Sequence, residues 1–158
     1  MIYNWIVSNE LLSDPENGKR GFNITYRDID LPDFLNFCSC TKYNVYHVIG
    51  LILDTDVKID AHIDCELMSH RHQFLTLPNT YIYYVDIDEN MKGGDLVIES
   101  DTVIRPVSNM AIVNEAGIEH SVTEIKYCSK PRIMLVCERY RFFKRYYDAL
   151  RTPIYAKG

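Results

Sequence analysis

Long apolar runs are missing from this sequence of 158 residues. No stretch approaches the roughly 18 apolar residues that suggest a transmembrane helix. The longest candidate, residues 46–53, is short enough to be one buried strand. Residues 1–7 have neither a basic region nor a small-residue cleavage site, so we expect no secretory signal and no contact with a membrane.

Glycine, proline and positive charge are also scarce. Seven glycines and six prolines exclude collagen-like and linker architectures. Seventeen basic against 22 acidic residues give a net charge of -5, which argues against nucleic acid as a partner. The 47% hydrophobic fraction excludes a disordered chain. We therefore expect one folded domain over residues 1–158, because this length argues against two full-sized domains.

The cysteines are too few and too irregular for a disulfide framework. There are five of them, an odd number without regular spacing. Free thiols in a reducing cytosol are the favoured interpretation, so we expect a cytoplasmic protein, in a bacterium or in the host cell of a virus. Cys38 and Cys40 form a CxC pair, but no second pair stands at zinc-ligand spacing, and zinc or redox chemistry there is less favoured.

Short strand-like segments make up most of the chain. They are rich in Val, Ile, Tyr and Thr, are separated by turn residues, and cover residues 43–53, 79–87, 95–99, 110–114, 121–127 and 132–139. This pattern predicts a mainly β sandwich or barrel with a core over about 43–139. Residues 13–18 indicate a turn, and a short helix is expected after residue 31.

The C-terminal segment changes its period. Tyr140, Phe143, Tyr147 and Leu150 are spaced as one stripe of a helix, which we predict over about 139–151. Residues 139–158 hold six basic residues and one acidic residue. Such a helix could contact phosphates or an anionic surface. We favour the alternative, in which its aromatic stripe packs on the sheet and its basic face is solvated.

His62, Asp64 and His120 are the candidate metal ligands. Residues i and i+2 of a strand face the same side, so His62 and Asp64 can point into one cavity. Two imidazoles and one carboxylate form the facial triad of non-haem Fe(II) oxygenases, which leaves three neighbouring positions open. An HxD pair alone is more often a polar surface pair, so the neighbouring motifs decide the interpretation.

Those motifs follow in a fixed order. After HxD come Thr80-Tyr-Ile-Tyr-Tyr-Val-Asp86, Gly93-Gly-Asp-Leu96, Pro106 before a strand, His120, and Arg132 at the start of another strand. In this order the sequence resembles the 2-oxoglutarate and Fe(II)-dependent dioxygenases, especially their prolyl 4-hydroxylase-like branch. The resemblance covers residues 62–138. It implies a double-stranded β-helix (jelly roll) with flanking helices, which agrees with the strand pattern.

The resemblance also implies a role for each matching residue. Fe(II) would be bound by His62, Asp64 and His120. The distal carboxylate of 2-oxoglutarate would pair with Arg132, whose planar fork suits a carboxylate, and would accept a hydrogen bond from Tyr84. The pocket walls would be Ile82, Leu96 and Val122. The implied cofactors are Fe(II), 2-oxoglutarate as co-substrate and O2, with ascorbate as a candidate reductant.

Three departures from the family pattern stand out. Arg132 lies twelve residues after His120, whereas the family places its basic residue nine or ten after the distal histidine. Lys130, ten residues after it, is the rival anchor, but Arg132 opens the apolar run as the family's residue does. Asp86 replaces an asparagine. Glu138 stands where an aromatic residue is frequent, and it would face inward together with Arg132.

The implied activity is hydroxylation of an unactivated C–H bond in a prolyl or other protein side chain, with succinate and CO2 as co-products. Alternatives are a hydroxylase of a free amino acid or small metabolite, a jelly-roll binding module without iron, and a nucleic-acid demethylase, which only the basic C-terminal segment favours. Oligomeric state is left open. His70-Arg-His72 lacks the glutamate of a cupin motif, and we expect a loop near the mouth of the site.

Overall fold

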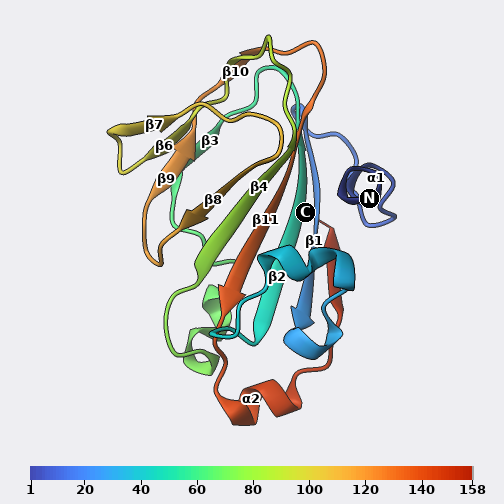
Figure 1. Ribbon diagram of the computed structural model, residues 1–158, viewed down its shortest axis with the longest axis vertical. Coiled ribbons are helices and arrows are strands. Elements are labelled where there is room, and N and C mark those ends of the chain that lie inside the picture. The colour runs from blue at the N-terminus through green and yellow to red at the C-terminus, as the bar shows by residue number, and fades with distance from the viewer. Residues whose placement is uncertain (158) are drawn as a thin grey trace.

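Two antiparallel sheets and a two-stranded ribbon form the protein, seen here in a computed structural model that describes residues 1–157 (Figure 1). The larger sheet has the order β12 (Ile154–Lys157), β1 (Lys19–Arg27), β2 (Val45–Leu53), β11 (Arg132–Tyr140), β4 (Asn79–Asp86) and β8 (Met110–Asn114). The smaller sheet has the order β3 (Ile59–His62), β9 (His120–Val122), β6 (Leu96–Ile98) and β7 (Thr102–Ile104). The ribbon pairs β10 (Ile125–Tyr127) with β5 (Lys92–Gly93).

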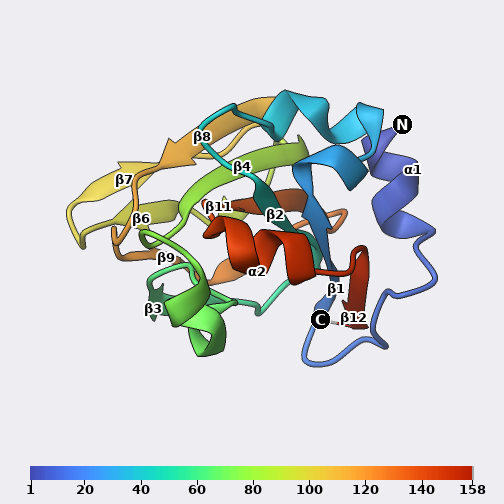
Figure 2. The ribbon, with the colours of Figure 1, turned by 90° about the horizontal axis from the view of Figure 1, so that it is seen from below.

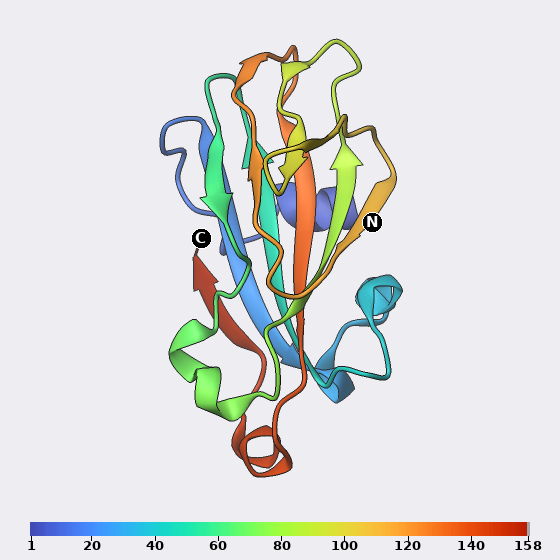
Figure 3. The ribbon, with the colours of Figure 1, turned by 90° about the vertical axis from the view of Figure 1, so that its left-hand side faces the viewer.

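The two sheets lie face to face, and the few helices are short (Figure 3). They are α1 (Ile2–Val7), α2 (Lys144–Ala149) and the 3-10 helices η1 (Asp28–Asp30), η2 (Asp33–Cys38) and η3 (Met68–Gln73). Within residues 1–157, none is long and apolar enough to cross a membrane. The expected mainly β jelly roll is confirmed.

The central strands β2 and β11 are buried on both faces, which explains their nearly continuous apolar sequences. On the outer face, α1 and η2 contribute Ile6 and Leu35 to a cluster that includes Phe22 of β1. Figure 2 shows α1 on the side of the larger sheet away from the smaller one. On the inner face, Tyr84 and Met134 belong to a second cluster, directed toward the smaller sheet.

The structure adds the short strands β5, β7 and β12, which were not predicted, while most of the predicted strands are confirmed within one or two residues. β1 was not among them, although Phe22, Ile24 and Tyr26 alternate with smaller or polar residues and pack on the outer face. The predicted strand 121–127 is divided into β9 and β10. Its break lies where the backbone N–H of Thr123 bonds to the carbonyl of Asp95, before the chain joins the ribbon.

The predicted helix over 139–151 is wrong in its extent, because α2 covers only Lys144–Ala149. Strand β11 continues to Tyr140, and Phe142 forms an isolated bridge with Phe74. Tyr140 and Phe142 therefore pack around Phe74 from extended backbone, with ring centroids 4.9 and 5.8 Å away. Tyr147 and Leu150 pack against the same cluster, as expected, whereas Phe143 of the predicted stripe is exposed.

Candidate functional site

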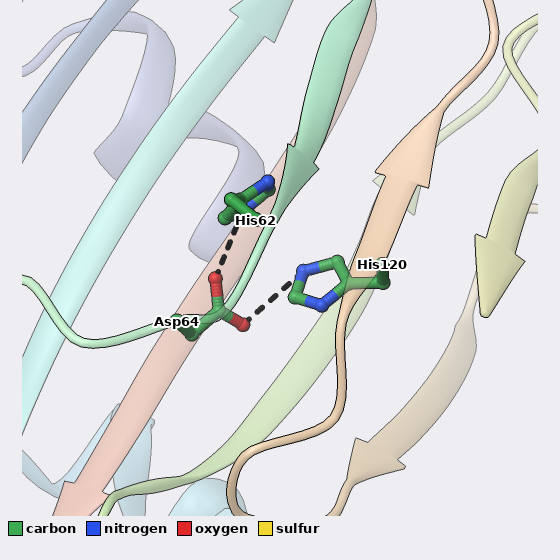
Figure 4. A group of neighbouring side chains, drawn as sticks. All are labelled: His62, Asp64 and His120. Carbon is green, nitrogen blue, oxygen red and sulfur yellow. Dashed lines mark hydrogen bonds and ion pairs between the residues drawn. The ribbon is translucent and has the colours of Figure 1, made fainter. Parts of the chain in front are cut away.

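His62, Asp64 and His120 meet at the edge of the smaller sheet (Figure 4). His62 ends β3 and lies opposite His120, the first residue of β9, while Asp64 follows two residues after β3. The Nε2 atom of His62 lies 3.1 Å from Asp64 Oδ1, and that of His120 lies 3.3 Å from Asp64 Oδ2. Within residues 1–157, this is the one cluster of three or more potential metal ligands.

Neighbouring groups orient both imidazoles toward the carboxylate. His62 Nδ1 lies 2.8 Å from the carbonyl oxygen of Asp60. His120 Nδ1 lies 2.9 Å from the Asn114 amide nitrogen and 3.3 Å from the carbonyl oxygen of Ile118. Each ring therefore presents Nε2 to Asp64. A carbonyl oxygen that accepts the Nδ1 proton is the kind of second partner that orients a histidine ligand in metal sites. Nothing in the sequence singled out Asn114, apart from its place at the end of a predicted strand.

The electrostatics of the cluster favour an ionised carboxylate. Burial would raise the pKa of Asp64, but hydrogen bonds with His120 and His62 outweigh it and hold the pKa below its usual range. The pKa of His62 is raised, chiefly by its hydrogen bond with Asp64. Asp64 Oδ2 is buried, and its contact among residues 1–157 is the ion pair with His120. A divalent cation would satisfy this oxygen and both Nε2 atoms, so the donor set fits a metal ion.

A cavity of about 120 Å³ lies between the two sheets and includes the cluster. The exposed charged residues Lys19 and Glu66 also line it, and sequence reasoning missed both. The predicted pocket residues all line this cavity, namely Ile82, Tyr84, Leu96, Val122 and Arg132. Ile82 and Tyr84 on β4 thus face the same side, as do His120 and Val122 on β9.

Arg132 is a buried cation without an anionic partner among residues 1–157. It is 0% exposed, and its Nη1 donates to the carbonyl of Gly94 at 2.7 Å. Its guanidinium carbon lies 4.9 Å from the centre of the Tyr84 ring. Arg132 Nε and Nη2 and the Tyr84 hydroxyl are buried and, within residues 1–157, unpartnered.

Burial lowers the pKa of Arg132 and raises that of Tyr84, although Arg132 partly offsets the second effect. An unpaired buried charge costs several kcal/mol or more, so this arrangement favours an added anion. Two free N–H groups and a hydroxyl in one cavity match the acceptors of a carboxylate.

Lys130 lies outside the cavity. Its Nζ is 2.6 Å from Asp86 Oδ1, and this lysine side chain is about half exposed. The substitution of Asp86 for the family's asparagine thus supplies a partner for Lys130. The geometry favours Arg132 over Lys130 as the group that meets a buried ligand.

Gly93 and Gly94 place the carbonyl that holds Arg132. Both have positive φ angles, +74° and +72°. A Cβ atom on Gly93 would lie 1.9 Å from the carbonyl oxygen of Glu124, so only glycine fits between β5 and β10. The double-glycine motif thus contributes to the site through the backbone.

The other metal candidates do not come together. Cys38 is buried, and its thiol donates to the carbonyl of Leu35. His70 Nδ1 lies 3.0 Å from the Gln73 amide, and His72 packs edge-on against Tyr146. Within residues 1–157, neither the CxC pair nor the HxH pair belongs to a group of three ligands, and all five cysteines are free thiols.

Comparisons with known proteins support the fold. No family model and no curated protein match the sequence. An oxidoreductase of the 2OG-Fe(II) oxygenase family from Burkholderia pseudomallei aligns with a TM-score of 0.57 and 16% identity, over 81% of this chain and 71% of that one. A prolyl-4-hydroxylase from Pseudomonas putida aligns with a TM-score of 0.50 and 15% identity, over 68% of this chain and 55% of that one. At these identities the likeness establishes a shared fold.

Proposed function

We propose that this protein is a cytoplasmic Fe(II)- and 2-oxoglutarate-dependent oxygenase that hydroxylates an unactivated C–H bond. The observation that carries the proposal is the unpaired, fully buried guanidinium of Arg132 in the cavity that also contains the His62, Asp64 and His120 cluster. A metal cluster alone fits many reactions. A cluster of metal-binding side chains that shares a cavity with an unpaired carboxylate-binding group fits a co-substrate that binds both.

Each group then has one task. His62, Asp64 and His120 hold Fe(II), while Arg132 and Tyr84 hold the distal carboxylate of 2-oxoglutarate by charge-assisted hydrogen bonds. Ile82, Leu96 and Val122 are the apolar walls that exclude water. Fe(II), 2-oxoglutarate and O2 together supply the oxidising power and leave succinate and CO2 as co-products.

The leading substrate is a prolyl or other protein side chain, on the family resemblance. A free amino acid or small metabolite is the second candidate. Lys19 and Glu66 favour it, because one residue of each charge lines the cavity. A zwitterion would complement both charges.

The test is turnover of 2-oxoglutarate to succinate by the purified protein with Fe(II), O2 and ascorbate. We expect succinate from wild type and none from the His62→Ala and Asp64→Ala variants. Proline-containing peptides and free amino acids are then compared for a mass gain of one oxygen atom. Absence of both succinate formation and divalent-metal binding in wild type would refute the proposal.

A further inference from the structure

Two buried polar side chains of β11 reach the loop that follows Asp64. The Glu138 carboxyl group accepts the backbone N–H of Glu66, at 3.0 Å to Oε2 and 3.3 Å to Oε1. The Tyr140 hydroxyl accepts the backbone N–H of Leu67 at 3.3 Å and donates to Glu138 Oε2. Both side chains are almost fully buried, 1% and 0% exposed.

We propose that Glu138 and Tyr140 are positioning residues that hold the backbone after Asp64, so that its carboxylate faces His62 and His120. The inference rests on the proposed function, because it assigns the Asp64 carboxylate to a metal ion. It goes beyond that function by naming the groups that keep this ligand in place.

The loop needs such support because the sheet ends before Asp64. The β3–β9 pairing ends at the His62–His120 pair, and Asp64 lies two residues further on. The backbone N–H groups of Glu66 and Leu67, two and three residues after Asp64, donate hydrogen bonds to the side chains of β11. Glu138 and Tyr140 therefore replace the missing strand partner with side-chain acceptors from the opposite sheet.

A carboxyl group at this place is costly, which argues for a specific task. The rest of β11 from Ile133 to Cys137 is apolar and buried, and an apolar residue would suit the core better. Burial, partly offset by the Tyr140 and Glu66 hydrogen bonds, raises the pKa of Glu138 to about 8. A neutral amide of the same shape is therefore a close mimic, and Glu138→Gln is the conservative variant.

The first measurement is backbone amide hydrogen exchange in the metal-free protein. We expect Glu138→Leu to accelerate exchange at Glu66 by about tenfold, the effect of one lost hydrogen bond. Tyr140→Phe should act mainly on Leu67, and Glu138→Gln should stay near wild type. Unchanged exchange at both amides in Glu138→Leu and Tyr140→Phe would overturn the proposal that these side chains hold the loop. This outcome does not depend on enzymatic activity.

The second measurement is the Mn(II) dissociation constant, with Mn(II) as a redox-stable probe. We expect it to rise about tenfold or more in Glu138→Leu and Tyr140→Phe, as for other outer partners of metal ligands. Affinity for 2-oxoglutarate at saturating Mn(II) should change less than about twofold, because Arg132 is untouched.

The matched control is Thr80→Val. Thr80 is buried opposite Glu138 on β4, so the change removes a polar group from the same layer without touching the loop. Its Mn(II) affinity should equal that of wild type. Equal losses in Thr80→Val and Glu138→Leu would show a general packing effect and overturn the positioning role. A wild type that binds no Mn(II) would instead refute the proposed function itself, and the ligand role with it.

Discussion

An unpaired guanidinium in a core is unfavourable until an anion joins it. Arg132 retains one hydrogen bond to Gly94 and a contact with the Tyr84 ring, and both are weak compensation for lost hydration. Arg132 thus lowers the stability of the ligand-free protein, as is common for residues of a ligand-binding site. The same reasoning applies to the Tyr84 hydroxyl, which burial also leaves without a partner within residues 1–157.

Tyr84→Phe should therefore change stability and binding in different directions. We expect the free energy of unfolding without ligand to stay constant or rise by up to about 1 kcal/mol, because an unsatisfied buried hydroxyl is removed. The dissociation constant of 2-oxoglutarate should rise about tenfold through the lost charge-assisted bond. Denaturant unfolding and calorimetric titration with Mn(II) present measure the two quantities.

Tyr83→Phe is the control for that prediction. It makes the same chemical change on the next residue, whose hydroxyl donates to Asn109 rather than into the cavity. Affinity for 2-oxoglutarate should not change. An equal loss of affinity in both variants would contradict the role given to Tyr84.

His47 makes the stability depend on pH. Its Nδ1 lies 2.7 Å from Thr25 Oγ1, its Nε2 has no partner among residues 1–157, and burial lowers its pKa to about 4. The folded protein thus binds this proton less readily than the unfolded chain, whose histidine pKa is about 6.5. The free energy of unfolding therefore has its full value above pH 6.5 and decreases as the pH falls toward 4, because the unfolded chain takes up this proton first.

We expect His47→Gln to remove this dependence. Between pH 7.5 and pH 4, wild type should lose about 3 kcal/mol more free energy of unfolding than the variant. Urea unfolding of both proteins at a series of pH values measures the difference, in which the titrations that they share cancel. Parallel curves for the two proteins would show that His47 is not the titrating group.

At the scale of elements, the ribbon of β5 and β10 fixes the Gly94 carbonyl against Arg132. Gly93→Ala should displace this ribbon, because the new Cβ would collide with the Glu124 carbonyl in addition to straining a positive φ. We expect at least a tenfold weaker 2-oxoglutarate affinity, measured by titration at saturating Mn(II).

Gly117→Ala separates the collision from the strain. Gly117 has a similar φ of +79°, but the nearest atom to its Cβ is Leu77 Cδ1 at 3.6 Å. This variant should lose about 1–2 kcal/mol of stability through strain alone and keep its 2-oxoglutarate affinity. Equal affinity in both alanine variants would contradict the role of the ribbon.

Strands were predictable where apolar and β-branched residues run together, as in β2, β4 and β11. Strand β1 was harder to predict because Gly21 and Asn23 interrupt its apolar residues, and its strand partners lie beyond residue 44. The C-terminal helix was overestimated because aromatic residues at helical spacing also suit an extended segment that packs on one cluster. Periodicity alone does not separate these two cases.

The meeting of His62, Asp64 and His120 and the residues of the cavity walls were predictable, because motif order preserves their positions on successive strands. The positioning contacts were not. Glu138 accepts a hydrogen bond from a backbone N–H 72 residues away. Every residue except proline has this group, so the sequence does not show which one is bound. Asn114 and Lys19 likewise reach the site only through the pairing of the strands that carry them.

At the scale of the molecule, the site joins two sheets of unequal burial. The larger sheet contains the fully buried β11, whereas β3 and β7 of the smaller sheet have intermediate or exposed residues only. The metal candidates lie on or next to the smaller sheet, and Arg132 and Tyr84 lie on the larger one. A metal with a bound dicarboxylate would therefore connect the two sheets.

The smaller sheet should consequently open more easily than the larger one in the ligand-free protein, and ligand should protect it selectively. At Mn(II) and 2-oxoglutarate concentrations of about 100 times their dissociation constants, each ligand adds about 2.7 kcal/mol, so the two together add about 5.4 kcal/mol, or roughly 10,000-fold slower amide exchange. We expect this slowing in β3, β6 and β9, and little change in β2. His62→Ala with the same additions should show none of it. Uniform slowing across both sheets would mean that the ligands stabilise the whole fold at once, because the two sheets would then open only together.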